Sequence, residues 1–416
     1  MKKLIEKYCD TNLVIRIVIG FTLGAVFGIF VKNITVIESL GALFVGSMKA
    51  VAPVLVFLLV CCAIASASDS IGKKFRLVVF LYLLNTFLSA IVSVVGNFIF
   101  PITVDLPAKS ADINSASVGI SDVINNLLTS VVANPVSSIS NANYLGILFW
   151  AVIIGVCLKK VASEVTIRMM KDFSEAMSKG VSGIIQFAPI GVFGLVYTSV
   201  VKSGFYIFRD YGRLLLLLVG CMLVCALIIE PLIVYVLLRR NPYPLVFTCL
   251  KESGITAFFT RSSAANIPIN MQLCEKLGLS KEFYSVSIPL GATISTNAAA
   301  VTISTMTLVL CKTLGITVDI PSAFILVVMS TIGACGASGV AGGSLLLIPM
   351  ACSLFGISDS VAMYMVGVGF IIGVIQDAVE TAVNSSGGIL LTATAEYWHR
   401  EKHVKDVNVL SDVANG

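Results

Sequence analysis

Charged residues are scarce in this chain. Only 12% of its 416 residues are Asp, Glu, Lys or Arg, against roughly 25% in ordinary soluble domains. Hydrophobic residues make up 57% of the chain, and the mean hydropathy is +0.97. This composition excludes an ordinary soluble domain and predicts an all-α polytopic protein embedded in a lipid bilayer.

Residue patterns typical of enzymes and metal sites are also missing. The only histidines, His399 and His403, lie in the hydrophilic C-terminal stretch. Neither an H-E-x-x-H nor a G-x-S-x-G motif occurs, and phosphate loops and nucleic-acid signatures are absent. The eleven cysteines lie mostly in apolar segments, without the paired spacing of a metal site or a disulfide framework. We therefore expect no enzyme, no cofactor and no nucleic-acid partner.

Several apolar runs exceed the roughly 18 residues that indicate a membrane-spanning helix. They cover 13–31, 40–65, 77–100 and 214–238; a further span is expected at 181–201, and a shorter run covers 144–158. We expect the first run to be a mature helix rather than a cleaved signal peptide, because it is long and already charged at Arg16.

Basic residues cluster at the ends of these runs. The clusters are Lys2, Lys3 and Lys7; Lys73, Lys74 and Arg76; Arg239 and Arg240; and Arg400, Lys402 and Lys405. A cytoplasmic N-terminus with alternating spans places all of them inside, as the positive-inside rule requires. The polar stretch 101–142 is then an external loop, and 396–416 is a cytoplasmic tail.

Two apolar segments in the second half are interrupted by small polar residues. They are "SGITAFFTRSSAANIPINMQLC", 253–274, and "SAFILVVMSTIGACGASGVAGGSLLLIPMACSLFG", 322–356. The arms of the first are about half of the roughly 20 residues needed to cross a bilayer, so both segments are predicted to be re-entrant hairpins. A full helix follows each one, at 283–311 and 361–391. Such a duplicated unit is typical of secondary transporters with inverted repeats.

Polar side chains form a stripe on the last of these helices. Asp377, Glu380, Thr381, Asn384 and Gly388 are three or four residues apart and share one helical face. An acid within a membrane span is by default a functional-site hypothesis. The alternative is a structural pair, neutralised by Arg261 or by protonation.

The tip of the first hairpin, "TRSSAANIP", offers a guanidinium and two hydroxyls at Arg261, Ser262 and Ser263. Free backbone amides at a helix N-terminus favour a carboxylate ligand. The alternative is that the serines only cap a helix, although capping and anion binding are compatible.

A third motif, "PLGATISTNAAAVTIST", 289–305, interrupts a helix with small polar residues and no charge. If the helix unwinds there, oxygens of Gly291, Thr293, Ser295 and Asn297 become hard ligands that suit sodium. Close helix packing through small residues explains the same composition.

The order of the four motifs "TRSSAANIP", "GATISTNAAA", "GASGVAGGS" and "QDAVETAVN" resembles that of the dicarboxylate/amino acid:cation symporters, which have the glutamate-transporter fold. The resemblance covers residues 10–395. It is strongest to the bacterial, sodium-coupled serine/threonine branch, whose "FFTRSSAANIP" and "CGASGVAGGSLLLIP" strings occur here nearly intact.

The resemblance implies eight transmembrane helices, two re-entrant hairpins, inverted repeats and a homotrimer. Helices 1–2 (1–76) and helices 4–5 (143–205) are then the scaffold. Helix 3 (77–100) and residues 206–395, which hold helix 6, hairpin 1, helix 7, hairpin 2 and helix 8, are then a transport domain that moves like an elevator.

The resemblance also implies roles for single residues. Asp377 matches the acid that binds the substrate ammonium, with Thr381 and Asn384 as polar neighbours. Ser263 and the backbone around it match the carboxylate receptor. The remaining substrate-site residues are the hairpin-1 tip residues Arg261 and Ser262 and the hairpin-2 lid residues Val340, Gly342 and Ser344.

Position 380 discriminates between substrates in this family. Members that take acidic substrates have an arginine there, which pairs with the side-chain carboxylate of the substrate. Glu380 would repel that carboxylate and could accept a hydrogen bond from a hydroxyl instead. Glu380 is also expected near Arg261, with which it could pair.

The sodium ligands implied by the resemblance are only partly present. The family's "NMDGT" string aligns with 295–299, so its Asn and Asp become Ser295 and Asn297, and an expected Asp is replaced by Gly388. The remaining oxygen donors implied are Tyr82, Asn85, Thr86, Gly291, Thr293, Thr331 and Asn384. Fewer or weaker sodium sites are therefore expected.

The predicted function is secondary active, sodium-coupled import of the hydroxylated amino acids serine and threonine across the bacterial inner membrane. Sodium is the coupling ion. The alternatives are a proton-coupled amino acid or dicarboxylate symporter, in which Glu380 or Glu230 titrates, and a passive anion channel.

Overall fold

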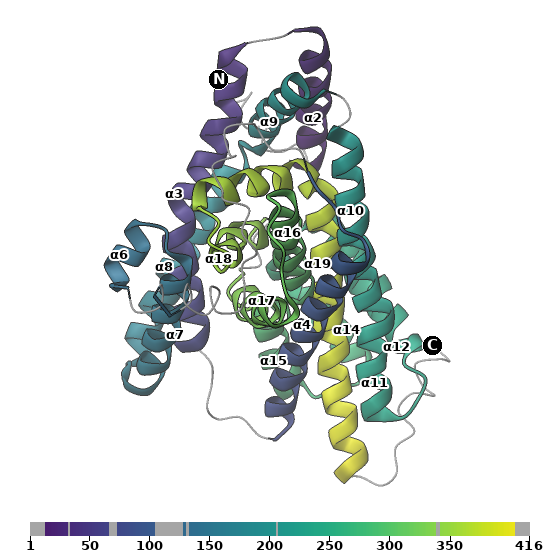
Figure 1. The fold of residues 1–416 in the computed structure, drawn as a ribbon. Helices are drawn as coiled ribbons and strands as arrows, with labels where there is room; N and C mark the ends of the chain where they lie inside the picture. Colours follow the sequence, from purple (N-terminus) through teal and green to yellow (C-terminus); the bar gives the residue numbers. More distant parts are fainter. Residues whose placement is uncertain are drawn as a thin grey trace, which may run out of the picture.

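The computed structural model describes residues 13–31, 34–65, 73–104, 128–129, 133–204, 207–337 and 342–403. They form helices and the turns between them, as predicted (Figure 1). Six of these helices are long and apolar enough to cross a bilayer, or seven if the bent pair α8 (Glu164–Ile185) and α9 (Ala188–Ser203) is one span. The length and apolar composition of these helices confirm the prediction of a polytopic helical membrane protein.

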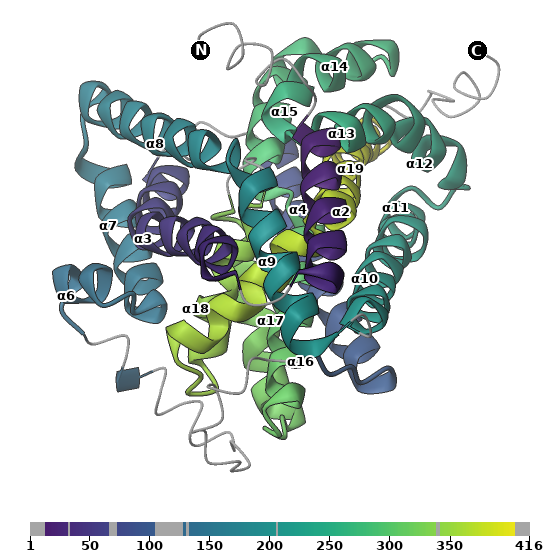
Figure 2. The same ribbon diagram turned by 90° about the horizontal axis from the view of Figure 1, so that it is seen from above.

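The N-terminal half forms one group of packed helices. It comprises α2 (Leu13–Phe30), α3 (Thr35–Ala65), α6 (Pro135–Ser140), α7 (Tyr144–Val161), α8 (Glu164–Ile185) and α9 (Ala188–Ser203). Helix α2 packs on α9, and α3 packs on α7, α8 and α9. Figures 1 and 2 both show α3, α7 and α8 together on one side of the molecule.

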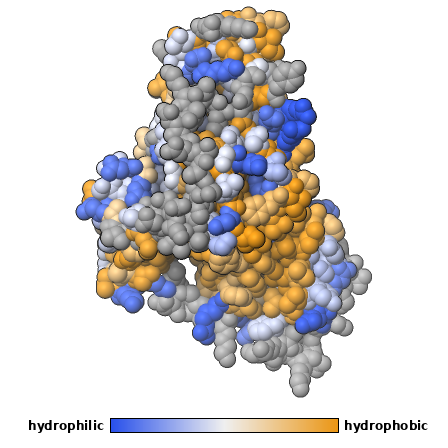
Figure 3. Space-filling model, viewed as in Figure 1, coloured by the Kyte–Doolittle hydropathy of each residue, from blue (hydrophilic) through white to orange (hydrophobic). Residues whose placement is uncertain are grey.

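Helix α4 (Lys73–Ile99) packs instead with helices from the second half of the chain, against α16, α17 (Ile320–Ala334) and α19 (Asp359–His403). That group also holds α10 (Ile207–Val224), the π-helical segment η2 (Cys225–Ile229), α11 (Glu230–Leu238), α15 (Lys281–Ile294) and α16 (Asn297–Thr313). The broad hydrophobic surface on the side shown in Figure 3 matches a protein surrounded by lipid.

The first interrupted segment folds as a helix, a break and a second helix. Its first arm joins α12 (Tyr243–Cys249), the π-helical segment η3 (Leu250–Gly254) and α13 (Ile255–Thr260), and its second arm is α14 (Ser263–Lys276). Helix α14 packs back on α13 and η3. The first arm therefore begins ten residues before the predicted start at Ser253 (253 − 243).

The second interrupted segment has the same plan. Its first arm is α17 (Ile320–Ala334), which begins at the N-cap Asp319, and its second arm joins the 3-10 segment η4 (Ser344–Leu347) to α18 (Ile348–Ser353). Helix α17 packs against both η4 and α18. Of the tip between them, residues 338–341 lie outside the described residues.

Three sequence predictions on helix bounds need correction. The predicted span 181–201 is bent by 53° between α8 and α9, where Pro189 lies in the first turn of α9. Helix α3 begins at Thr35, not at residue 40. Helix α19 (Asp359–His403) continues beyond the predicted end of the transport domain at residue 395.

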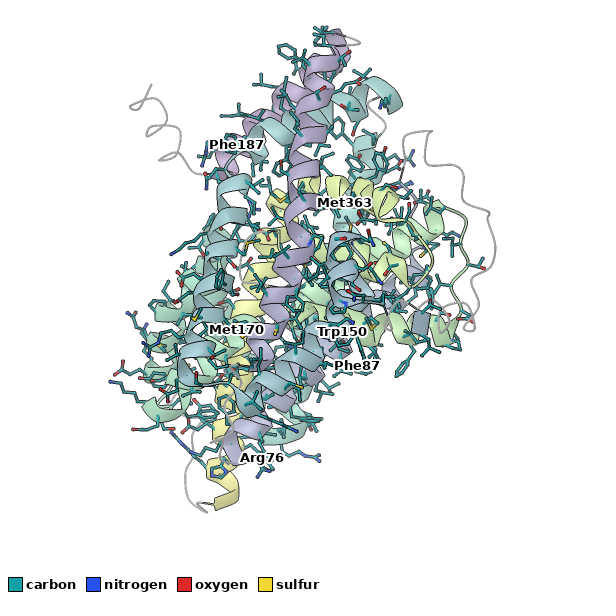
Figure 4. All side chains as sticks on the ribbon, turned by 90° about the vertical axis from the view of Figure 1, so that its left-hand side faces the viewer. Arg76, Phe87, Trp150, Met170, Phe187 and Met363 are labelled. Carbon is teal, nitrogen blue, oxygen red and sulfur yellow. The ribbon has the colours of Figure 1, made fainter. Side chains whose placement is uncertain are left out.

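Helix α19 is longer than predicted because the carboxylate of Glu396, a residue assigned to the cytoplasmic tail, is buried. Glu396 accepts hydrogen bonds from the amide and hydroxyl of Ser280, at 3.0 and 2.8 Å, and so holds the start of α15. Lys74 and Arg400 approach the same carboxylate at 3.7 and 2.9 Å. The starts of α4 and α15 therefore lie beside the end of α19, and Figure 4 shows Arg76 at that end of the molecule.

Candidate functional site

The candidate site lies where the two interrupted segments meet α19. The polar stripe predicted on that helix is buried: Asp377, Glu380, Thr381 and Asn384 are all less than a tenth exposed. Their hydrogen-bond partners come from the first interrupted segment, the second interrupted segment and α16. The stripe therefore faces the protein interior, as predicted.

Asp377 joins the tips of both interrupted segments. Its Oδ2 accepts a hydrogen bond from Arg261 Nε at 2.7 Å, and its Oδ1 accepts one from the amide of Gly342 at 2.9 Å. Asp377 is buried and Arg261 nearly so, with 5% of the Asp377 side chain and 10% of the Arg261 side chain exposed. Arg261 therefore pairs with Asp377, which corrects the expectation of a pair with Glu380.

The backbone at Arg261 has an unusual conformation. Arg261 ends α13 in the left-handed region, with φ of 51°, a conformation that is uncommon for a bulky side chain. Such outliers concentrate at binding sites, where neighbouring structure enforces them. The guanidinium keeps a spare donor, because Arg261 Nη1 is buried without a hydrogen bond to any described residue.

Glu380 lies in a separate set of neutral donors. Its Oε2 accepts hydrogen bonds from Gln376 Nε2 at 2.6 Å, Thr302 Oγ1 at 2.7 Å and Ser344 Oγ at 2.9 Å. Among the described residues, no hydrogen bond falls on its Oε1. Three donors thus hold one carboxylate oxygen and leave the other able to accept a further donor.

Two of these donors, Thr302 and Gln376, were not identified from the sequence. Gln376 lies four residues before Glu380 on the same helical face, so helical spacing could have identified it. Thr302 lies on α16, 78 residues before Glu380 in the sequence, and only the fold brings them together.

The predicted site residues of the two hairpin tips lie in different parts of the site and make different contacts. Ser262 caps α14 by accepting a hydrogen bond from the Ala265 amide, which confirms the capping interpretation for that residue. Ser263 is buried and lines a small cavity that Asn384 and Gly388 also line. Gly342 and Ser344 contact α19, whereas Val340 lies outside the described residues.

The helix predicted at 283–311 is interrupted, as the third motif suggested. Helix α15 ends at Ile294, α16 begins at Asn297, and the two residues between them are not helical. The amide of Ala298 in the first turn of α16 donates to Asn384 Oδ1 at 2.8 Å. Asn384 therefore holds the N-terminal end of α16, where unpaired amides need an acceptor.

The predicted sodium ligands do not all converge on one place. Asn85 and Asn297 meet at one carboxylate oxygen of Glu230, each at 3.2 Å. The Tyr82 hydroxyl bonds Thr392 at 2.6 Å and packs on Gly291, where a Cβ would lie 2.8 Å from it.

The hydroxyls of Thr86, Thr293 and Thr331 each donate to a carbonyl of the preceding helical turn. Thr293 is exposed, so its side chain lies away from the buried polar residues. Ser295 is buried, and its Oγ has no hydrogen bond to a described residue.

The cavities at this site are much smaller than an amino acid. One of about 20 Å³ is bordered by Arg261, Gly342 and Asp377 on one side and by Ile17 and Ile185 of the N-terminal group on the other. The cavity beside Ser263 measures about 10 Å³, the room of about one water molecule. An amino acid could enter only if the tips of the interrupted segments moved away from α19.

Comparison with known proteins identifies the family. The model of the sodium:dicarboxylate symporter family matches residues 13–398. A protein of Bifidobacterium adolescentis named serine/threonine transporter SstT is 53% identical over 390 residues, which cover 94% of this chain and 90% of that protein. Proteins of the same name from Streptococcus agalactiae and Streptococcus thermophilus are 52% and 51% identical over 396 residues, which cover 95% of this chain and 98% of theirs. This chain belongs to the sodium:dicarboxylate symporter family, a family of transporters rather than enzymes.

Proposed function

We propose that this chain is a sodium symporter that imports serine and threonine. The names of its relatives and of its family support the substrate and the coupling ion. The structural observation that carries the proposal is the buried Glu380, whose Oε2 is held by three donors while Oε1 remains able to accept a hydroxyl. A carboxylate at this position favours a hydroxylated side chain over an acidic one.

The substrate backbone would bind between Asp377 and Arg261. An amino acid is a zwitterion, and this ion pair offers a carboxylate for its ammonium and a guanidinium for its carboxylate. Arg261 Nη1 is an unused buried donor, and a carboxylate such as Asp377 has about four acceptor sites, of which two are filled here. Without substrate, each side chain neutralises the other, which avoids an isolated buried charge.

Substrate entry would require the second interrupted segment to open. In the structure this segment is held on α19 by the bond from Gly342 to Asp377 and the bond from Ser344 to Glu380. Both acceptors are residues that we assign to substrate binding. A bound substrate would therefore replace the contacts that close the second interrupted segment, and this segment would act as a lid.

We propose the number of transmembrane helices, the repeats, the orientation and the oligomeric state from the family to which the chain belongs. Eight transmembrane helices would surround two re-entrant hairpins in inverted repeats, with both termini cytoplasmic in the bacterial inner membrane. Helices α2, α3 and α7–α9 would be the scaffold of a homotrimer. Helices α4 and α10–α19 would be the moving domain of an elevator, and the separate packing of the two groups supports this division.

A binding assay tests the substrate assignment. Purified protein should bind serine and threonine more tightly than alanine, and should not bind aspartate, because only the first two offer a hydroxyl to Glu380. Affinity should rise as sodium replaces choline in the buffer. Equal affinity for alanine and serine would contradict the role of Glu380, and tight aspartate binding would favour a dicarboxylate symporter.

Thr302→Val tests whether the donors around Glu380 support hydroxyl recognition. Without the Thr302 hydroxyl, Oε2 loses a buried donor and turns toward the remaining ones, so Oε1 is less well placed for a substrate hydroxyl. We expect serine affinity to fall about tenfold, which corresponds to about 1.4 kcal/mol. Alanine affinity should change much less, as measured by isothermal titration calorimetry.

Thr307→Val is the matched control for this variant. Thr307 is also fully buried on α16, and its hydroxyl donates to the Ile303 carbonyl at 2.8 Å. Its substitution should leave the ratio of serine to alanine affinity unchanged. A Thr302 variant that lost affinity for serine and alanine equally would show a general effect on packing.

A further inference from the structure

The residues assigned to the substrate carry more negative than positive charge. They include two carboxylates, Asp377 and Glu380, and one guanidinium, Arg261. Arg261 pairs with Asp377 at 2.7 Å, and none of the ion pairs formed by the described residues includes Glu380. A zwitterion such as serine adds no net charge when it binds. One negative charge therefore stays unpaired at Glu380, and such a charge within a membrane span is costly.

The donors around Glu380 are all neutral, and all of them meet the same oxygen. Gln376, Thr302 and Ser344 donate to Oε2 at 2.6, 2.7 and 2.9 Å. Glu380 keeps 7% of its surface exposed. Its Oε1 accepts no hydrogen bond from the described residues, and it is not one of their enclosed polar atoms without a partner. Oε1 is therefore the end of the carboxylate that a ligand can reach.

Gln376 supplies a second unused acceptor beside this carboxylate. Its side chain is completely buried, and its Nε2 donates to Glu380 Oε2 at 2.6 Å and to Thr302 Oγ1 at 2.8 Å. These contacts use both hydrogens of the amide nitrogen. Gln376 Oε1 is buried without a hydrogen-bond partner among the described residues, although buried acceptors usually have one. Because both atoms belong to one small amide group, Oε1 also lies close to the carboxylate.

An ammonium group matches these two acceptors better than a hydroxyl does. A hydroxyl donates one hydrogen, whereas an ammonium donates three, so only the ammonium can serve both Glu380 Oε1 and Gln376 Oε1. An ammonium also carries the positive charge that Glu380 lacks, and a buried charge is stable only when it is paired. Diaminopropionate is serine with its hydroxyl replaced by an amine, so it needs no more room than serine.

We propose that the site also takes short diamino acids, such as L-diaminopropionate. The side-chain ammonium would bind Glu380 Oε1 and Gln376 Oε1, while the α-ammonium and the α-carboxylate bind Asp377 and Arg261. This inference rests on the proposed function, because it uses the same residues for the substrate backbone. Glu380 would then reject acidic side chains and accept short side chains that end in either a hydroxyl or an ammonium.

Competition against labelled serine in saturating sodium tests this substrate class in the unaltered protein. L-Diaminopropionate should displace serine at concentrations no higher than unlabelled serine requires. Alanine has the same backbone without a side-chain donor, so it should require more. L-Diaminobutyrate, which is one methylene longer, is the second probe, because its two ammonium groups lie further apart and lower each other's pKa less. Lysine is the size control, and it should not compete.

Glu380→Gln separates recognition of the charge from recognition of the shape. This substitution leaves the side-chain ammonium without a counter-charge, whereas the serine hydroxyl can still bind an amide oxygen. We expect the affinity for diaminopropionate to fall by at least about 100-fold and that for serine by about tenfold, measured by isothermal titration calorimetry. Glu252→Gln is the control for removal of a carboxylate, since Glu252 pairs with Lys276 at 2.8 Å away from the site. It should change neither affinity.

Three results would overturn the inference. The first is displacement of serine by diaminopropionate that is no better than displacement by alanine. The second is a Glu380→Gln protein that loses affinity for diaminopropionate and serine equally; if this variant does not fold, the competition in the unaltered protein decides. The third is lysine that competes as well as diaminopropionate. Normal serine binding without competition by diaminopropionate would contradict this inference alone, whereas absence of serine binding would contradict the proposed function.

Discussion

Replacing Asp377 by asparagine should abolish serine and threonine binding. The substrate ammonium would then have no counter-charge in a site where water is excluded, and an unpaired buried charge is strongly unfavourable. Removing one partner of a buried ion pair costs about 3–5 kcal/mol. We therefore expect a loss of affinity of at least about 100-fold, measured by isothermal titration calorimetry with serine in saturating sodium.

The same substitution also leaves Arg261 without its anion, so loss of binding must be separated from loss of fold. Thermal unfolding of the detergent-purified variant provides this check, because a cooperative transition near the parental Tm shows that the variant is folded. Ser386→Ala is a suitable control on the same helix, since among the described residues the Ser386 hydroxyl donates to carbonyls of its own helix alone. A folded Asp377→Asn protein that bound serine normally would remove Asp377 from the site.

Glu380→Arg should change the selectivity of the transporter. Arginine at this position removes the acceptor for the substrate hydroxyl and adds a donor that pairs bidentately with carboxylates. We expect serine affinity to fall by more than about tenfold and aspartate binding to become measurable. Competition by unlabelled aspartate against labelled serine, compared between the variant and the parent protein, measures both effects.

Glu380→Gln is the milder companion, because it keeps the side-chain shape and removes the charge. Gln376, Thr302 and Ser344 can still surround an amide at this position, so the fold should be retained. The preference for serine over alanine should fall, because a neutral oxygen is a weaker acceptor than a carboxylate. If both Glu380 variants kept the parental preference, Glu380 would have no part in selecting the substrate.

The polar residues of α19 were predictable because they follow one helical period. Asp377, Glu380 and Asn384 repeat at three and four residues within an apolar segment, so the sequence alone indicates that they share an interior face. The breaks at the first interrupted segment and between α15 and α16 were predictable for a similar reason. Small polar residues in the middle of an apolar segment indicate a helix that cannot continue through lipid.

The partners of these residues were not predictable from local pattern. Arg261 and Asp377 are 116 residues apart, and Arg261 takes the left-handed conformation at the end of α13, which local pattern does not indicate. Glu230 lies in an apolar helix with no polar periodicity around it, and its contacts with Asn85 and Asn297 span 145 and 67 residues. Helical spacing does not encode contacts of this kind, because they depend on how whole helices pack.

Helix ends were also less predictable than helix cores. The predicted tail began at Glu396, where the sequence becomes hydrophilic, yet α19 continues to His403. Burial of Glu396 against Ser280, Lys74 and Arg400 stabilises those turns. A composition change therefore marked the edge of the apolar region rather than the end of the helix.

Uptake of labelled serine into proteoliposomes tests the central claim most directly. An inward sodium gradient should accumulate serine above its external concentration, and replacing sodium by choline at constant pH should abolish this accumulation. Unlabelled threonine should compete, whereas aspartate should not. Accumulation driven by a proton gradient in the absence of sodium, or serine flux that never exceeds equilibration, would contradict sodium-coupled symport.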